Sequence, residues 1–202
     1  GLLGVGTQRF LSQVGQLPYV IRFENMPDAS APAQEVLIRD TLDTEVFDLS
    51  TFRLGEIRFG ERRVAVPPGL TSFSTRVPLE APLEVVITAS LVTETGVVTW
   101  RFTTLDTGTG ELPFDPLDGF LPPNQTSPEG EGSVSFTVKA RDGLAHGTEI
   151  RNQARIHFDL NEPIDTPPWV NTIDRSPPSS RVTDLAGVQN TRVFTVRWSG
   201  AD

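Results

Sequence analysis

The sequence of 202 residues contains no cysteine. This absence excludes disulfide bonds, thiol catalysis and zinc sites with cysteine ligands. A chain of this length can be stable through its hydrophobic core alone, so the absence does not by itself fix the compartment. It fits exported bacterial modules better than animal extracellular ones.

Long apolar segments are also absent, as is an excess of positive charge. No run approaches the roughly 18 consecutive apolar residues of a transmembrane helix, and the opening GLLGVG does not resemble a signal peptide. The formal net charge is −9. Nucleic acids and anionic membranes would be repelled, so we expect neither nucleic-acid binding nor direct membrane insertion. Divalent cations, in contrast, suit an acidic surface.

Apolar and turn-forming residues are abundant. Hydrophobic residues make up 37% of the chain and include 12 Phe and 3 Trp, which is enough for a sizeable core. The 17 Gly and 17 Pro together stay below the roughly 25–30% that is typical of low-complexity disorder. We therefore interpret them as turns between many short strands.

Alternation of apolar and polar residues predicts the strands. In residues 150–158 every second side chain falls on one face, which predicts a half-buried antiparallel strand. Asn152 is the polar exception on the apolar face, and we expect a structural role for it as a buried, hydrogen-bonded amide. The same alternation covers residues 19–24, 36–39, 83–91, 98–102 and 134–140. Since no long window shows the helical period, the prediction is an all-β fold.

Three features between the strands are less regular. Gly96 predicts a hairpin turn. Residues 48–54 indicate either a short helical turn or an irregular strand. Residues 105–132 form a long loop that we expect to be ordered, with Phe114 and Phe120 pinning it to the core and a mobile tip at residues 127–132.

Four segments together resemble a known family. They are FEN at residues 23–25, APAQEV at 31–36, GFLPPN at 119–124 and ARIHFDLNEPIDTPPWVNTID at 154–174. As a set they resemble a conserved Ig-like repeat module of bacterial surface and secreted proteins, similar to the wider conserved-repeat domain family of unknown function. The tail, PPSSRV followed by FTVRWSGAD, is similar to the opening of an Ig-like or fibronectin-like module. The resemblance implies an Ig-like antiparallel β-sandwich and carries no catalytic residue.

The expected domain organisation follows from these patterns. Residues 1–17 are predicted to be an N-terminal extension, and residues 18–174 the Ig-like sandwich. A Pro/Ser linker is expected at residues 175–181. Residues 182–202 would then be the start of a second, truncated β-domain or a strand that docks on the first domain or on another chain.

Calcium is the one cofactor that the sequence leaves open, since hard cations bind six to eight oxygen ligands. The candidate ligands in the long loop are Asp106, Glu111, Asp115 and Asp118, and those after the last strong strand are Asp159, Asn161 and Asp165. The alternative is that these residues shape turns, which Asp, Asn and Gly do for backbone reasons.

The sequence bears on three further kinds of site. Trp169 follows two prolines near the end of the sandwich, where it could cap the fold, serve an interface or bind a ligand such as a carbohydrate. An isopeptide bond at Asn152 would need Lys139, the sole lysine, which lies on the face opposite the apolar row of its strand. No nucleophile, base and orienting group can be assembled, so we expect no enzyme.

The expected function is a non-catalytic structural, spacer or adhesive module of a multidomain bacterial extracellular or cell-surface protein. Calcium could stiffen it, and an open sheet edge could assemble with neighbours by strand exchange. Its partners would be neighbouring domains of the same chain, other copies, or surface proteins. The alternative is an accessory carbohydrate- or protein-binding module of a secreted enzyme.

Overall fold

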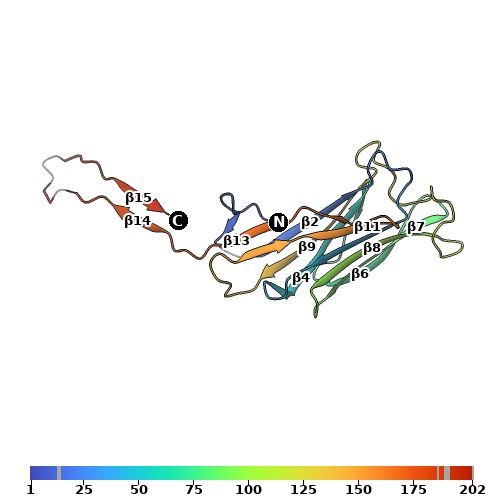
Figure 1. Cartoon of the computed structure of the whole chain (residues 1–202), viewed down its shortest axis with the longest axis horizontal. Coiled ribbons are helices and arrows are strands. Elements are labelled where there is room, and N and C mark those ends of the chain that lie inside the picture. The colour runs from blue at the N-terminus through green and yellow to red at the C-terminus, as the bar shows by residue number, and fades with distance from the viewer. Residues whose placement is uncertain (13–14, 186, 189–191, 202) are drawn as a thin grey trace.

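All regular elements of the described chain are β-strands, which confirms the predicted all-β class. The structure is a computed structural model that describes residues 1–12, 15–185, 187–188 and 192–201. Figure 1 shows an elongated sandwich from which a C-terminal hairpin projects along the long axis. No helix that could span a membrane occurs in the described part of the chain.

The larger layer of the sandwich is a six-stranded sheet. In spatial order its strands are β12 (Ile164–Asp165), β11 (Ala154–Phe158), β3 (Glu35–Thr41), β8 (Val97–Asp106), β7 (Leu83–Val92) and β6 (Ser72–Pro78). All neighbours in it are antiparallel. The predicted hairpin is the pair β7 and β8, and its turn requires Gly96, which has φ of 71° and whose added Cβ would lie 2.1 Å from the Leu42 carbonyl oxygen.

The facing layer is a four-stranded antiparallel sheet. Its strands are β2 (Gln16–Glu24), β9 (Glu131–Ala140), β4 (Phe47–Phe59) and β5 (Arg62–Val64). The ambiguous segment at residues 48–54 lies inside β4, where the register against β9 shifts between Asp48 and Arg53. Of the two interpretations left open by the sequence, the irregular strand is therefore correct.

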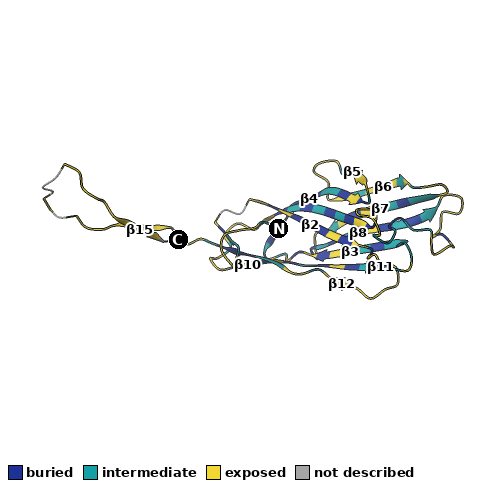
Figure 2. Cartoon of the chain, turned by 90° about the horizontal axis from the view of Figure 1, so that it is seen from above, coloured by how far each residue is buried: buried dark blue, intermediate teal, exposed yellow. Residues whose placement is uncertain are grey.

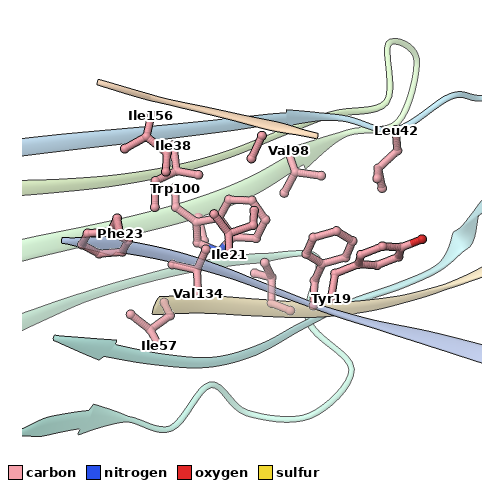
Figure 3. Close-up of a cluster of buried hydrophobic side chains, with 14 of the residues drawn as sticks. Tyr19, Ile21, Phe23, Ile38, Leu42, Ile57, Val98, Trp100, Val134 and Ile156 are labelled. Atoms are coloured by element: carbon pink, nitrogen blue, oxygen red, sulfur yellow. The ribbon is translucent and has the colours of Figure 1, made fainter. Parts of the chain in front are cut away.

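The core lies between the two sheets and is built from the inward-facing residues of each strand (Figure 3). Phe136 of β9 is central to it, because its ring lies 5.1 Å from Tyr19, 5.4 Å from Phe52 and 5.7 Å from Trp100, measured between centroids. Trp100 belongs to the opposite sheet, so this cluster joins both layers. Burial of each such side chain contributes about 1.5–3 kcal/mol to the free energy of unfolding.

A third, smaller sheet closes one end of the sandwich. It consists of β1 (Phe10–Leu11), β13 (Trp169–Ile173) and β10 (Glu149–Asn152), with β13 in the middle. β1 runs parallel to β13, whereas β10 runs antiparallel to it. Only Gln153 separates β10 from β11, so one alternating stretch of chain serves two sheets.

The long loop between β8 and β9 is anchored differently from the prediction. Phe120 and Leu121 are buried, and Leu121 pairs with Ala33 in an isolated bridge. Phe114, in contrast, is 105% exposed, so the prediction that it pins the loop is wrong. The tip expected to be mobile runs directly into β9, and the Ser127 hydroxyl donates to Glu131 Oε1 at 2.6 Å.

Beyond the sandwich, β14 (Ser179–Val182) and β15 (Trp198–Ala201) pair only with each other among the described strands. The C-terminal strand thus forms its own hairpin, and β14 occupies part of the expected linker. Figure 2 shows that this hairpin is almost entirely exposed. Its exposed apolar side chains include Val182, Leu185, Val188, Phe194, Val196 and Trp198.

Candidate functional site

The most unusual group of side chains lies where β10 passes into β11. Asn152 is 7% exposed and its Nδ2 donates a hydrogen bond to Asp40 Oδ2 at 2.7 Å. Asp40, on β3, is fully buried. The amide therefore ties β10 to β3 at the point where the chain changes from one sheet to the other. Lys139, the residue that an isopeptide bond would need, is exposed on β9.

Asp40 was missed by the sequence analysis, although a signal was present. Val36 and Ile38 face the core, and the period of two places Asp40 next on the same face. Burial raises the pKa of its carboxyl group to about 7, and the hydrogen bond from Asn152 acts in the opposite direction. Of its two carboxylate oxygens, only Oδ2 has a hydrogen-bond partner.

Other buried polar atoms are unsatisfied as well. Among the described residues, the buried side-chain atoms without a hydrogen-bond partner are Tyr19 Oη, Asp40 Oδ1, Trp100 Nε1 and Asn152 Oδ1. Burial raises the pKa of the Tyr19 hydroxyl, and the nearby Asp40 carboxylate raises it further. Buried polar atoms without partners are rare and costly, so this cluster is the main candidate for a feature with a role beyond packing.

The second group surrounds Trp169 at the same end of the sandwich. The Trp169 Nε1–H donates to the Leu2 carbonyl oxygen at 3.1 Å and to Asn171 Oδ1 at 3.0 Å. The guanidinium carbon of Arg9 lies 3.9 Å from the ring centroid, which is a cation–π contact. The N-terminal segment, predicted to be an extension, therefore covers Trp169, for which the sequence leaves open capping of the fold, an interface or ligand binding.

Asn171 holds this N-terminal segment in place. The Asn171 side chain is buried, and its Nδ2 donates to the Leu2 carbonyl oxygen at 3.1 Å and to the Arg9 carbonyl oxygen at 3.0 Å. Together with the pairing of β1 and β13, these bonds fasten the first residues of the chain to the last strand of the sandwich. The sequence offered no local signal for Asn171, because its acceptors lie at the other end of the chain.

Two of the calcium candidates of the long loop, Asp106 and Asp115, shape turns. Asp106 Oδ1 accepts hydrogen bonds from the backbone N–H groups of Gly108 and Thr109, at 2.7 and 3.1 Å. Asp115 Oδ1 accepts one from the Leu117 N–H at 2.9 Å. Glu111 is exposed and Asp118 half-buried in the same loop.

The candidates after β11 are also engaged. Asp159 Oδ1 accepts from the backbone N–H groups of Gln34 and Glu35, at 3.0 and 2.7 Å. Asp165 makes a bidentate ion pair with Arg155, whose Nε lies 2.7 Å from Oδ1 and whose Nη2 lies 2.9 Å from Oδ2. This pairing lowers the pKa of the Asp165 carboxyl group. Asn161 is exposed in a turn. Within the described residues, no three His, Cys, Asp or Glu side chains gather as a metal site would require.

A serine, a histidine and an aspartate meet near the exit of the chain from the sandwich. His146 Nδ1 lies 3.3 Å from Asp174 Oδ1 and 3.4 Å from Ser176 Oγ. A catalytic triad needs the acid and the nucleophile on opposite nitrogens of the imidazole ring. Here both approach Nδ1 most closely, and the Ser176 hydroxyl is also 3.5 Å from Nε2, so the arrangement is a surface network.

We predict that Asn171→Ala loosens the N-terminal segment. Loss of both donors should lower the free energy of unfolding by about 1–3 kcal/mol. Hydrogen exchange should accelerate at the amides of Val5, Phe10 and Asp174, which bond within this segment or to it. In Asn171→Ala, exchange at the amides of β9 should stay unchanged. The control variant Asn161→Ala, at an exposed position, should exchange like the parent chain throughout. Equal protection of the N-terminal segment in Asn171→Ala and the parent chain would contradict the assignment.

We also predict that calcium leaves the protein unchanged. Because Asp106, Asp115 and Asp159 accept backbone N–H groups and Asp165 pairs with Arg155, calorimetric titration with calcium should give no binding heat. EDTA should not alter the melting temperature. A saturable heat, or a melting temperature that rises with calcium, would show that the loop rearranges into a cation site.

Comparison with known proteins adds a partial match. Residues 88–172, from within β7 to within β13, match a domain of unknown function (DUF7619). No curated protein matches the chain. Among solved structures, the chain is similar to a collagen-binding domain from a Staphylococcus aureus adhesin, with 12% identity and a TM-score of 0.37 over 78% of this chain and 87% of that one. The similarity therefore does not identify the repeat family that the sequence resembles.

Proposed function

We propose that the chain is a non-catalytic structural module of a multidomain bacterial extracellular or cell-surface protein. Its task is to connect neighbouring parts of that protein at a fixed spacing and to stay folded when tension pulls on the two ends of the module. The observation that carries this proposal is the parallel pairing of β1 with β13, which come first and last along the chain among the three strands of the closing sheet. The triad-like group around His146 lacks catalytic geometry, which also supports a role without catalysis.

Parallel pairing decides how the closing sheet responds to force. Phe10 pairs with Thr172 and Leu11 with Ile173, so both strands run in the same direction. Tension applied to the two ends of the chain enters β1 at its N-terminal end and leaves β13 at its C-terminal end. The bonds between the strands are then loaded together in shear and are not opened one at a time.

The contacts around Trp169 strengthen this connection. Before β1 can slide along β13, the bonds from Asn171 to the Leu2 and Arg9 carbonyl oxygens must break, as must the contact of Arg9 with Trp169. The Asp174 N–H also donates to the Leu11 carbonyl oxygen at 2.9 Å, directly at the exit of β13. The polar and aromatic contacts therefore lie along the path of the force.

The β14–β15 hairpin is the surface through which the module would meet a neighbouring domain, another copy or a surface protein. Trp198 is 73% exposed, and Val182, opposite it in the hairpin register, is 54% exposed. These exposed apolar side chains support the proposal of an interaction surface. Among the described strands, β14 and β15 pair only with each other, which supports strand addition as the mode of contact.

The pulling direction tests the structural proposal. Because the chain contains no cysteine, a pair of introduced thiols defines where force is applied. In Gln8→Cys/Arg175→Cys the handles flank β1 and β13 at opposite ends, which loads the strands in shear. In Gln8→Cys/Pro168→Cys both handles lie at the N-terminal ends of the strands, which peels them apart.

We predict that the shear pair unfolds at a force several times that of the peeling pair in single-molecule pulling at equal speed. All three handle positions are exposed, so both variants should melt at the temperature of the parent chain. Equal unfolding forces in the two variants would remove the support for a role under tension.

A second prediction concerns the hairpin. Deletion of residues 178–202 should leave the melting temperature of the sandwich unchanged, because β14 and β15 pair with each other. The deletion should also reduce the binding of an apolar fluorescent dye, and Trp198→Ser in the full chain should reduce it in part. A marked fall in melting temperature after deletion would mean that the hairpin belongs to the sandwich and is not a surface for partners.

A further inference from the structure

We propose that Asp40 is protonated in the folded protein and that its Oδ1 hydroxyl donates to Asn152 Oδ1, so that the two side chains form a cyclic acid–amide pair. Loss of this proton would open the pair and loosen the junction between β3 and β10. The closing end of the sandwich would then be a pH-sensitive device. This inference is independent of the proposed mechanical role.

The hydrogen bonds of the two side chains favour one additional proton. Asn152 Nδ2 donates to Asp40 Oδ2 at 2.7 Å, which forms one side of the pair. The remaining oxygen of each group, Asp40 Oδ1 and Asn152 Oδ1, has no partner. Two acceptors cannot bond each other, but a protonated carboxyl group is a donor. A single proton therefore satisfies two buried atoms at once.

Burial makes the neutral form of Asp40 favourable. The residue is 0% exposed, and an ionised carboxylate in such a place needs a positive partner or several donors. It has one donor, the Asn152 amide. Arg39, which precedes it in the chain, is exposed on the other face of β3. The raised pKa of about 7 agrees with this environment.

In the described part of the chain, the groups that face Asp40 from the neighbouring elements are uncharged at neutral pH. They are Val98 of β8 and Ala154 of β11, which pair with it, Asn152 of β10, and Tyr19 of β2. Tyr19 is the one titratable group among them, and its pKa is raised, so it stays neutral in the range that matters. Within this set, titration near neutral pH belongs to Asp40 alone.

The sign of the pH dependence follows from linkage. The pKa of Asp40 is raised from 3.8 to about 7 on folding, so the folded state binds the proton more tightly than the unfolded state. Its contribution to stability is complete below the unfolded pKa and is lost as the pH rises through the folded pKa. Asp165, whose pKa is lowered by Arg155, contributes in the opposite direction and at more acidic pH.

The decisive variant is Asp40→Asn, because an amide at position 40 can both accept from Asn152 and donate to it at any pH. We expect the variant to melt at nearly the temperature of the parent chain at pH 5 and at a higher temperature at pH 8. The difference in melting temperature between the two proteins isolates Asp40, because all other titrating groups are shared. The matched control is Asp43→Asn, an exposed residue three positions away, for which the difference should not change with pH.

A measurement on the unaltered chain keeps the proposal testable if the variant folds poorly. The carboxyl carbon resonance of Asp40, followed by NMR across the same pH range, should titrate near neutrality. Amide exchange in β10 and β13, relative to that in β9 at the same pH, should accelerate above that midpoint. A titration at the ordinary value of aspartate, or a melting-temperature difference that is constant between pH 5 and pH 8, would overturn the proposal.

Discussion

The closed end of the molecule depends on one constraint, which is that a single alternating stretch of chain must serve two sheets. Residues 149–152 pair with β13, and residues 154–158 pair with β3, with only Gln153 between them. The same inward row therefore continues across a change of partner. Asn152 is the last residue of β10, directly before this change, and its hydrogen bond to Asp40 joins β10 to β3, the strand with which β11 then pairs.

The strands could be predicted because their signal is local. Alternation in residues 19–24, 83–91, 98–102 and 134–140 corresponds to β2, β7, β8 and β9, since a period of two needs no knowledge of the partner strand. Residues 48–54 were ambiguous because the register shifts within this segment, and such an irregularity interrupts the period of two. Phe114 was wrongly placed in the core because hydrophobicity alone does not show which side of a loop faces it.

The candidate site was only half visible in the sequence. Asn152 could be singled out as the polar residue in an apolar row. Its partner Asp40 was not, because the strand predicted from alternation ended at residue 39, one position before it. The contacts between Leu2, Arg9 and Asn171 join the two ends of the sandwich sequence, and no local pattern encodes them. The acidic residues of the loops could be found in the sequence, but the pattern alone leaves calcium binding and turn formation open, because Asp shapes turns as readily as it binds cations.

The pairing of β1 with β13 also sets an order on how the fold can be completed. Phe10 precedes every other described strand of the sandwich in the chain, and its partner Thr172 comes only after them. If the chain folds from its N-terminal side during synthesis or export, the segment that contains β1 stays unpaired until β13 is available. Leu2 and Arg9 can bond Asn171 only once residue 171 is available, so the docking of the N-terminal segment would report that the module is complete.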